Sequence, residues 1–153
     1  MAWQEGVRQG VSDYSEVIRL DPNLAAAYGS RGFAWLGKKE YDKALSDYDE
    51  AIRLDPKDAL TWTHKVYLLA LCQDVKLRDI PKAKELLKQV IELRKSSPYN
   101  NEAFSVIAAA EGRFDEAIKY QEQALNNKNY EKEDGEKARK RLELYKQKKP
   151  WRE

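Results

Sequence analysis

Apolar residues in the first third of the chain recur every three or four positions, which is the spacing of one face of an α-helix. Tyr28, Gly32 and Trp35 share one such face. A second stripe follows after a short polar turn at residues 37–40, and it consists of Tyr41, Ala44, Leu45, Tyr48, Ala51 and Ile52. Pro56 ends the second helix, because proline cannot continue the helical hydrogen-bond ladder. The pattern therefore predicts a helical hairpin over residues 25–56.

The sequence Ile-Arg-Leu-Asp-Pro occurs at residues 18–22 and again at residues 52–56, so the two copies lie 34 residues apart. A fixed period of this length is typical of solenoids built from helix–turn–helix units. Gly32, Ala44 and Ala51 fit such packing, because two helices approach closely only where one side chain is small. We therefore expect an all-α, antiparallel helix-hairpin solenoid.

At these residues the chain resembles the tetratricopeptide repeat family. The family's pattern places an aromatic and then a small residue in the first helix, followed by an aromatic–x–x–Ala motif, a second alanine and a closing proline. The matching residues here are Tyr28, Gly32, Tyr41, Ala44, Ala51 and Pro56. The resemblance covers about residues 10–127 and implies a right-handed superhelix. The C-terminal sequence is also similar to the tails of many bacterial members of the family.

We expect one domain over residues 1–153, made of unequal units. The expected units are a partial repeat at 1–22, a repeat at 23–56, an irregular repeat at 57–97, a repeat at 98–127 and a capping helix at 134–149. The irregular repeat is five residues longer between Trp62 and Ala83 than its neighbour is between Tyr28 and Ala44. We place the excess in an inserted loop at residues 72–79, followed by a helix from Ile80 to Lys95. The first helix of the next repeat, from about residue 101 to 110, is expected to be short. A terminal helix with a polar outer face closes a solenoid, which is the role we assign to 134–149.

Stacked repeats curve, so their first helices line a concave groove. By the register of the family, the candidate partner-binding residues are Ser30, Phe33, Leu36, Leu60, Thr63, His64 and Tyr67. Co-chaperone members of the family hold a peptide's terminal carboxylate with Lys, Arg and Asn at such positions, and those residue types are absent from this set. Its apolar members suit an amphipathic helix or an extended apolar peptide. The alternative is that these side chains pack into the core.

The N-terminal partial repeat has a second helix but no recognisable first helix. Trp3, Val7, Val11 and Tyr14 would then need cover from another surface. An exposed apolar face of this kind predicts weak self-association, either as a homodimer or end to end.

Catalytic, cofactor-binding and metal-binding residues are not expected. His64 is the single histidine and Cys72 the single cysteine, and eight residues separate them on one predicted helix. That spacing corresponds to about 12 Å, too far for a thiolate–imidazole pair. One His and one Cys cannot supply a zinc site, and neither a P-loop nor a GxGxxG motif occurs. We therefore expect no enzyme activity and no cofactor, with Cys72 as a small buried hydrophobic residue.

The net charge of +2 is too small to indicate a nucleic-acid partner, but basic residues gather near the C-terminus. They are Lys137, Arg139, Lys140, Arg141, Lys146, Lys148, Lys149 and Arg152. They could contact nucleic acid or another anionic partner. The simpler interpretation is solubility together with favourable cations at a helix C-terminus.

The sequence thus predicts a protein–protein interaction module, an adaptor or scaffold that binds a peptide or helix of an unidentified partner in its groove. The first alternative is an assembly module that self-associates through its N-terminal repeat. The second is contact of the basic C-terminal helix with an anionic partner. Neither a secretory signal nor a run of about 20 apolar residues is recognisable, so we expect a cytoplasmic protein without a membrane partner.

Overall fold

The computed structural model describes the backbone of residues 2–95 and 97–152, and the side chains of these ranges apart from residues 2–5, 7 and 8. The described part contains eight α-helices and no strand. The helices are α1 (Ala2–Leu20), α2 (Ala25–Gly37), α3 (Tyr41–Leu54), α4 (Ala59–Leu71), α5 (Ile80–Leu93), α6 (Pro98–Ala110), α7 (Phe114–Leu125) and α8 (Lys128–Lys146).

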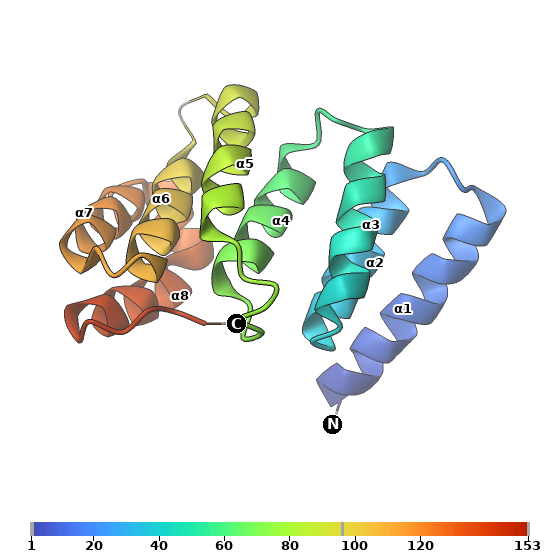
Figure 1. Ribbon diagram of the computed structural model, residues 1–153, viewed down its shortest axis with the longest axis horizontal. Helices are drawn as coiled ribbons and strands as arrows, with labels where there is room; N and C mark the ends of the chain where they lie inside the picture. Colours follow the sequence, from blue (N-terminus) through green and yellow to red (C-terminus); the bar gives the residue numbers. More distant parts are fainter. Residues whose placement is uncertain (1, 96, 153) are drawn as a thin grey trace.

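Consecutive helices pack as antiparallel hairpins, and the hairpins stand side by side in chain order (Figure 1). The pairs α2–α3, α4–α5 and α6–α7 form the hairpins, while α2, α4, α6 and α8 also touch one another in succession. Each unit therefore covers the apolar face of the next, as in other repeat arrays. The prediction of an all-α helix-hairpin solenoid is confirmed.

Small residues allow the close approach of α2 and α3. A Cβ atom added to Gly32 would lie 2.7 Å from Cε1 of Tyr48, so any side chain at this position would collide with the ring. Ala44 and Ala51 are buried on the facing helix, and Tyr48 is fully buried beside them. The alternation of one large ring with three small residues explains why the repeat pattern requires these residue types.

Side-chain caps fix where α4 and α5 begin. Asp58 accepts hydrogen bonds from the backbone N–H groups of Leu60 and Thr61, at 3.0 and 3.3 Å. Asp79 accepts from the N–H of Lys82 at 2.8 Å, and Pro81 occupies the first turn of α5, where no intrahelical donor is needed. The connection between α4 and α5 consists of residues 72–79.

The C-terminal helix begins and ends earlier than the expected range of 134–149, since α8 runs from Lys128 to Lys146. Asn127 caps it, accepting hydrogen bonds from the N–H groups of Asn129 and Tyr130, both at 3.1 Å. Tyr130 is buried against Ala124 and Ala138, which anchors the first turn. The helix stops before Lys148, whose positive φ of 55° leaves the helical region.

The first helix of the third hairpin is not short, because α6 starts at Pro98 and has 13 residues. Ser97 caps it by accepting a hydrogen bond from the N–H of Tyr99 at 3.3 Å. The preceding helix α5 stops at Leu93 rather than at Lys95. Both differences lie at helix ends, where apolar periodicity gives the weakest signal.

A buried ion pair joins α6 to α8. Glu102 and Arg141 form it, with side chains that are 6% and 1% exposed. Burial alone would lower the pKa of Arg141, but the Glu102 carboxylate opposes this effect and leaves the pKa above its ordinary value. Nearby, the hydroxyl of Ser105 donates to Oε1 of Gln121 at 2.9 Å. The packing of α6 against α7 and α8 therefore includes buried polar contacts.

The segment after α8 returns to the middle of the molecule and ends beside the α4–α5 connection (Figure 1). Trp151 packs against two core clusters, one formed by α4, α5 and α6 and one formed by α6, α7 and α8. Its ring lies 5.5 Å from Cζ of Arg141, a cation–π distance. Burial and the nearby positive charge of Arg78 lower the pKa of Arg152. The tail thus closes the C-terminal half of the solenoid.

Candidate functional site: the concave groove

A groove of about 900 Å³ opens between α1, α2 and α4. Its apolar lining includes Tyr14, Phe33, Ala34, Leu36 and Leu60. Phe33 is 58% exposed and Leu60 52% exposed, although both are large apolar side chains. Such exposure on a concave surface is typical of a site that another molecule covers.

The groove contains Ser30, Phe33, Leu36, Leu60 and His64, five of the seven residues predicted to bind a partner. The other two lie elsewhere. Thr63 is buried and its hydroxyl donates to the carbonyl oxygen of Ala59 at 2.7 Å. Tyr67 packs against the core cluster of α4, α5 and α6. For Tyr67, the alternative of core packing describes its position better than the groove does.

His64 connects the open surface to the core. Its ring centroid lies 5.3 Å from that of Phe33 and 5.8 Å from that of Tyr48. Phe33 is exposed in the groove, while Tyr48 is fully buried. The imidazole therefore contacts both rings in a tilted arrangement, at interplanar angles of 33° to Phe33 and 39° to Tyr48.

Two lysines also line the groove, and the family register includes neither of them. Lys39 lies in the turn after α2, where its positive φ of 60° places it outside the helical stripe. Its Nζ donates to the neutral amide of Gln73 at 3.2 Å. Lys137 belongs to α8, far away in sequence, and reaches the groove because the solenoid curves. Register counting on the first helices alone could find neither residue.

The one acidic residue among the described groove residues is Asp58. Its carboxylate caps α4 and also accepts a hydrogen bond from the hydroxyl of Thr61 at 2.5 Å. The negative charge therefore faces the positive end of the α4 dipole rather than the groove interior.

The N-terminal helix α1 forms one wall of the groove. Tyr14, predicted to mediate self-association, lines this wall, as do Gly6 and Gly10. Val11 is half-buried. The side chains of Trp3 and Val7, the other two residues of that prediction, lie outside the described part of the chain.

Two family models, both described as Tetratricopeptide repeat, match residues 25–58 and residues 103–130. The chain therefore contains tetratricopeptide repeats at these two places. The first match contains the whole α2–α3 hairpin, and the second contains most of α6 and all of α7. Repeats of this family are generally protein–protein interaction modules. No curated protein matches the chain. The bacterial type of the repeat stays a prediction.

Other chemistry has little support within the described residues. They contain no group of three or more His, Cys, Asp or Glu side chains that could hold a metal ion. Cys72 is buried, as predicted, and burial raises the pKa of its thiol. Searching the same residues, we find no helix with the length and apolarity needed to cross a bilayer.

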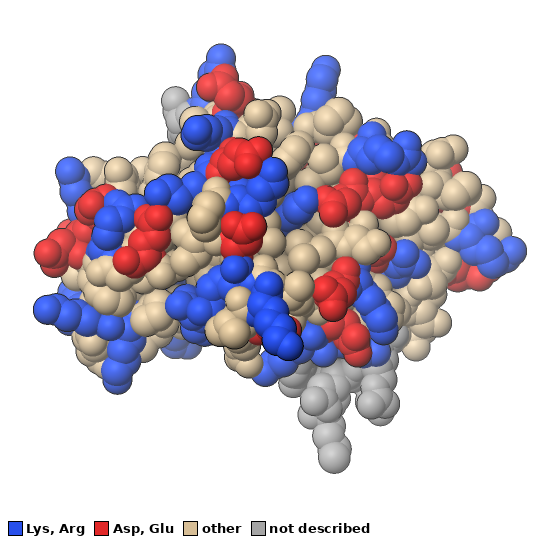
Figure 2. Space-filling model, viewed as in Figure 1, with Lys and Arg blue, Asp and Glu red and all other residues tan. Residues whose placement is uncertain are grey.

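Four of the eight basic residues near the C-terminus form described ion pairs with carboxylates. The ion pairs are Arg139–Glu131, Lys140–Glu136, Arg141–Glu102 and Lys146–Glu143. Arg141 belongs to the core and cannot meet a partner. On the face shown in Figure 2, acidic and basic side chains are interspersed. These contacts give no support to an anionic partner at α8.

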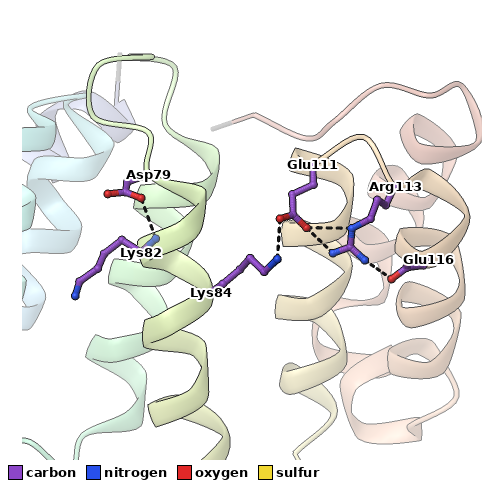
Figure 3. Close-up of polar contacts among 6 residues, drawn as sticks. All are labelled: Asp79, Lys82, Lys84, Glu111, Arg113 and Glu116. Carbon is purple, nitrogen blue, oxygen red and sulfur yellow. Dashed lines mark hydrogen bonds and ion pairs between the residues drawn. The ribbon is translucent and has the colours of Figure 1, made fainter.

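A chain of ion pairs crosses from α5 to the α6–α7 turn on the outer surface (Figure 3). Nζ of Lys84 lies 2.8 Å from Oε1 of Glu111, and Arg113 contacts both Glu111 and Glu116. Hydrogen bonds from Lys84 first and Arg113 second lower the pKa of Glu111. The residues satisfy one another, so we interpret this ridge as a link between neighbouring repeats rather than as a binding site.

Proposed function

We propose that the protein is an adaptor or scaffold that holds a segment of a partner protein in the groove between α1, α2 and α4. The observation that carries the proposal is the exposure of Phe33 and Leu60 on one concave surface. Fully burying a side chain of this size contributes about 1.5–3 kcal/mol. Two such side chains in one groove, one of them in contact with the His64 ring, match the central apolar contacts that dominate binding energy at protein interfaces.

The proposal is tested by peptide display on the immobilised protein, followed by binding measurements on three variants. Phe33→Asp and Leu60→Asp each place a charge in the groove, while Val75→Asp is a matched control. Val75 is 70% exposed on the α4–α5 connection and does not line the groove. We expect the selected peptides to bind the wild type and Val75→Asp equally, and to lose at least about 10-fold in affinity with either groove variant.

Circular dichroism of each variant shows whether it remains folded, which separates loss of binding from loss of structure. A selection that yields no peptide sensitive to Phe33→Asp and Leu60→Asp would refute the groove as the binding site.

Self-association through the N-terminal region is the second candidate. Leu20 at the end of α1 is 70% exposed, and Leu24 in the following turn is 41% exposed. Neither side chain lines the groove. If this end mediates assembly, sedimentation velocity will show a dimer at high concentration that Leu20→Asp converts to monomer. A monomer at every concentration excludes it.

A further inference from the structure

We infer that residues 147–152, the tail that follows α8, are a detachable intramolecular ligand of the concave surface. When docked, the tail fills the C-terminal half of this surface, and when released it opens this half to an aromatic residue of a partner segment. The place is separate from the groove between α1, α2 and α4, so the proposed function does not depend on it.

Equivalent positions of the first helices become more buried along the chain. The helices α2, α4 and α6 each have 13 residues, so their positions can be aligned from the first residue. At the ninth position Phe33 is exposed, Tyr67 is half-buried and Val106 is fully buried. Glu102 and Ala103, at the fifth and sixth positions of α6, are also buried, whereas their counterparts in α2 are half-buried. The concave surface is therefore open at α2 and filled at α6.

The tail supplies part of this cover. It runs from the end of α8 to the middle of the molecule (Figure 1). Trp151 packs against the core cluster that contains Val106. Its ring also lies 5.5 Å from Cζ of Arg141, whose guanidinium pairs with Glu102 and interacts electrostatically with Tyr67. One ring of the tail thus lies beside the concave positions of both α4 and α6.

The contacts of the tail resemble those of a bound peptide. The backbone N–H groups of Lys148 and Lys149 donate to carbonyl oxygens in the last turn of α8, both at 2.9 Å, and fix the start of the tail. Pro150 follows and has no N–H group to donate. Trp151 and Arg152 are half-buried, and Trp151 also lines an open pocket of about 500 Å³ beside α8. A half-buried aromatic anchor on a short segment can leave its site without unfolding the helices beneath it.

A contact between two cations opposes docking of the tail. Arg78 is fixed at the α4–α5 connection, where its Nε and Nη2 donate to the carbonyl oxygen of Cys72 at 3.2 and 2.9 Å. Burial first, and the positive charge of Arg78 second, lower the pKa of Arg152. The two guanidinium groups therefore repel each other in a partly desolvated place. This repulsion weakens docking and favours release of the tail.

Release of the tail would extend the open groove towards α6. His64 lines the groove, and Tyr67 lies one turn further along the same helix. An aromatic side chain fits the vacated place best, because it packs against the apolar cluster of α4, α5 and α6 and lies over the guanidinium of Arg141 as Trp151 does. A partner segment that reads both halves of the concave surface therefore has to compete with the tail.

The first test uses the full chain with Trp151→Ala and a fluorescein-labelled peptide with the sequence of residues 147–152. Fluorescence anisotropy should show at least about 10-fold tighter binding to Trp151→Ala than to the wild type, because the intact tail competes at a high effective concentration. A peptide with Ala in place of the tryptophan should bind neither protein. Trp35→Ala is the matched control, since it removes a ring from another cluster and should bind the peptide as weakly as the wild type.

Hydrogen exchange gives a second measurement on Trp151→Ala. Loss of the ring should quicken exchange in α6 and α8, and the added peptide should slow it again in the same helices.

The contact with Arg78 is tested by changing the charge of the peptide. A peptide with Glu in place of Arg152 should bind Trp151→Ala more tightly than the original peptide, and the gain should shrink in 300 mM salt. A peptide with Glu in place of Lys148 makes the same change in net charge and should gain less. Equal gains would show that overall charge is responsible and would overturn the role of Arg78.

Release is also measured on the wild type, so that the outcome does not depend on the folding of Trp151→Ala. The protein is labelled with 5-fluorotryptophan, and the ¹⁹F signal of Trp151 is assigned with Trp151→Phe. Saturation-transfer experiments should detect a released state with a population of about 0.1–10%. Arg152→Glu should lower this population, because it replaces the repulsion from Arg78 with attraction.

A folded Trp151→Ala that does not bind the peptide would overturn the inference, as would a single state of the Trp151 signal, because the tail would then be a permanent part of the core. Equal binding of the peptide to Trp151→Ala and to the wild type would also overturn it, since the peptide would bind elsewhere. Each of these results leaves the proposed function standing, which is tested separately with Phe33→Asp and Leu60→Asp.

Discussion

Arg141 is the residue whose surroundings in the structure differ most from those that its neighbours in the sequence indicate. Its neighbours Arg139 and Lys140 are exposed, and the local charge density is typical of a solvated helix face. The partner that draws it inward, Glu102, lies 39 residues away on α6. Helical periodicity reports which residues share a face but not which residues of another helix are opposite. Cys72 was predictable as a buried residue because its type alone favours burial.

For this single residue, we predict that the substitution Arg141→Met strongly destabilises the protein. The substitution leaves the Glu102 carboxylate buried without its cation, which costs about 3–5 kcal/mol. Urea unfolding monitored by circular dichroism measures the loss in the free energy of unfolding.

The matched control is the double variant Glu102→Leu with Arg141→Met, which removes both charges and should recover most of the stability. A double variant that is less stable than Arg141→Met would show that the ion pair is not the cause.

Among the elements, the hairpin at residues 25–56 was predictable because its signals are local: apolar stripes, a short polar turn and a closing proline. The start of α8 was not predictable in this way. Residues 128–133 are mostly charged or polar, with Tyr130 as their single aromatic residue, so the apolar stripe becomes recognisable only further along the helix. Asn127 was the available signal, since asparagine is a preferred N-cap residue.

We predict that Asn127→Ala destabilises the protein by about 1 kcal/mol through the loss of this cap. The change removes the acceptor for the N–H groups of Asn129 and Tyr130. Thermal unfolding of the variant and the wild type measures this loss of stability. Asn126→Ala is the control, because the side chain of Asn126 makes no described hydrogen bond, and it should change the melting temperature little. Equal effects of the two substitutions would contradict the assignment.

Over the whole molecule, curvature assembles the groove from parts that no local pattern connects. The register of the first helices predicted Phe33 and Leu60, which lie on adjacent stacked helices. The lysines escaped it, because one belongs to a turn and the other to the closing helix. The returning tail is a further long-range feature, since Trp151 contacts helices that precede it by dozens of residues.

We predict that Trp151→Ala loosens the C-terminal half and spares the N-terminal half. Losing the ring removes contacts to both C-terminal core clusters, and truncation of a half-buried tryptophan should cost about 2–3 kcal/mol. Hydrogen exchange should quicken in α6 and α8 and stay unchanged in α2 and α3.

Trp35→Ala is the reciprocal control for Trp151→Ala. Trp35 packs against the cluster that contains Tyr41 and Tyr48. Its loss should therefore quicken exchange in α2 and α3 first. If hydrogen exchange quickens equally in all helices of both variants, the helices unfold only together, as one cooperative unit.

The position of His64 has a consequence for spectroscopy. Because the chain has a single histidine, its imidazole protons give one assignable pair of signals in a proton NMR spectrum. The ring centroid lies 5.3 Å from that of Phe33 and 5.8 Å from that of Tyr48, so the ring currents of both aromatics displace these signals. Any molecule that enters the groove and turns Phe33 must move them. The resonance of one side chain can thus report occupancy of the groove without a label.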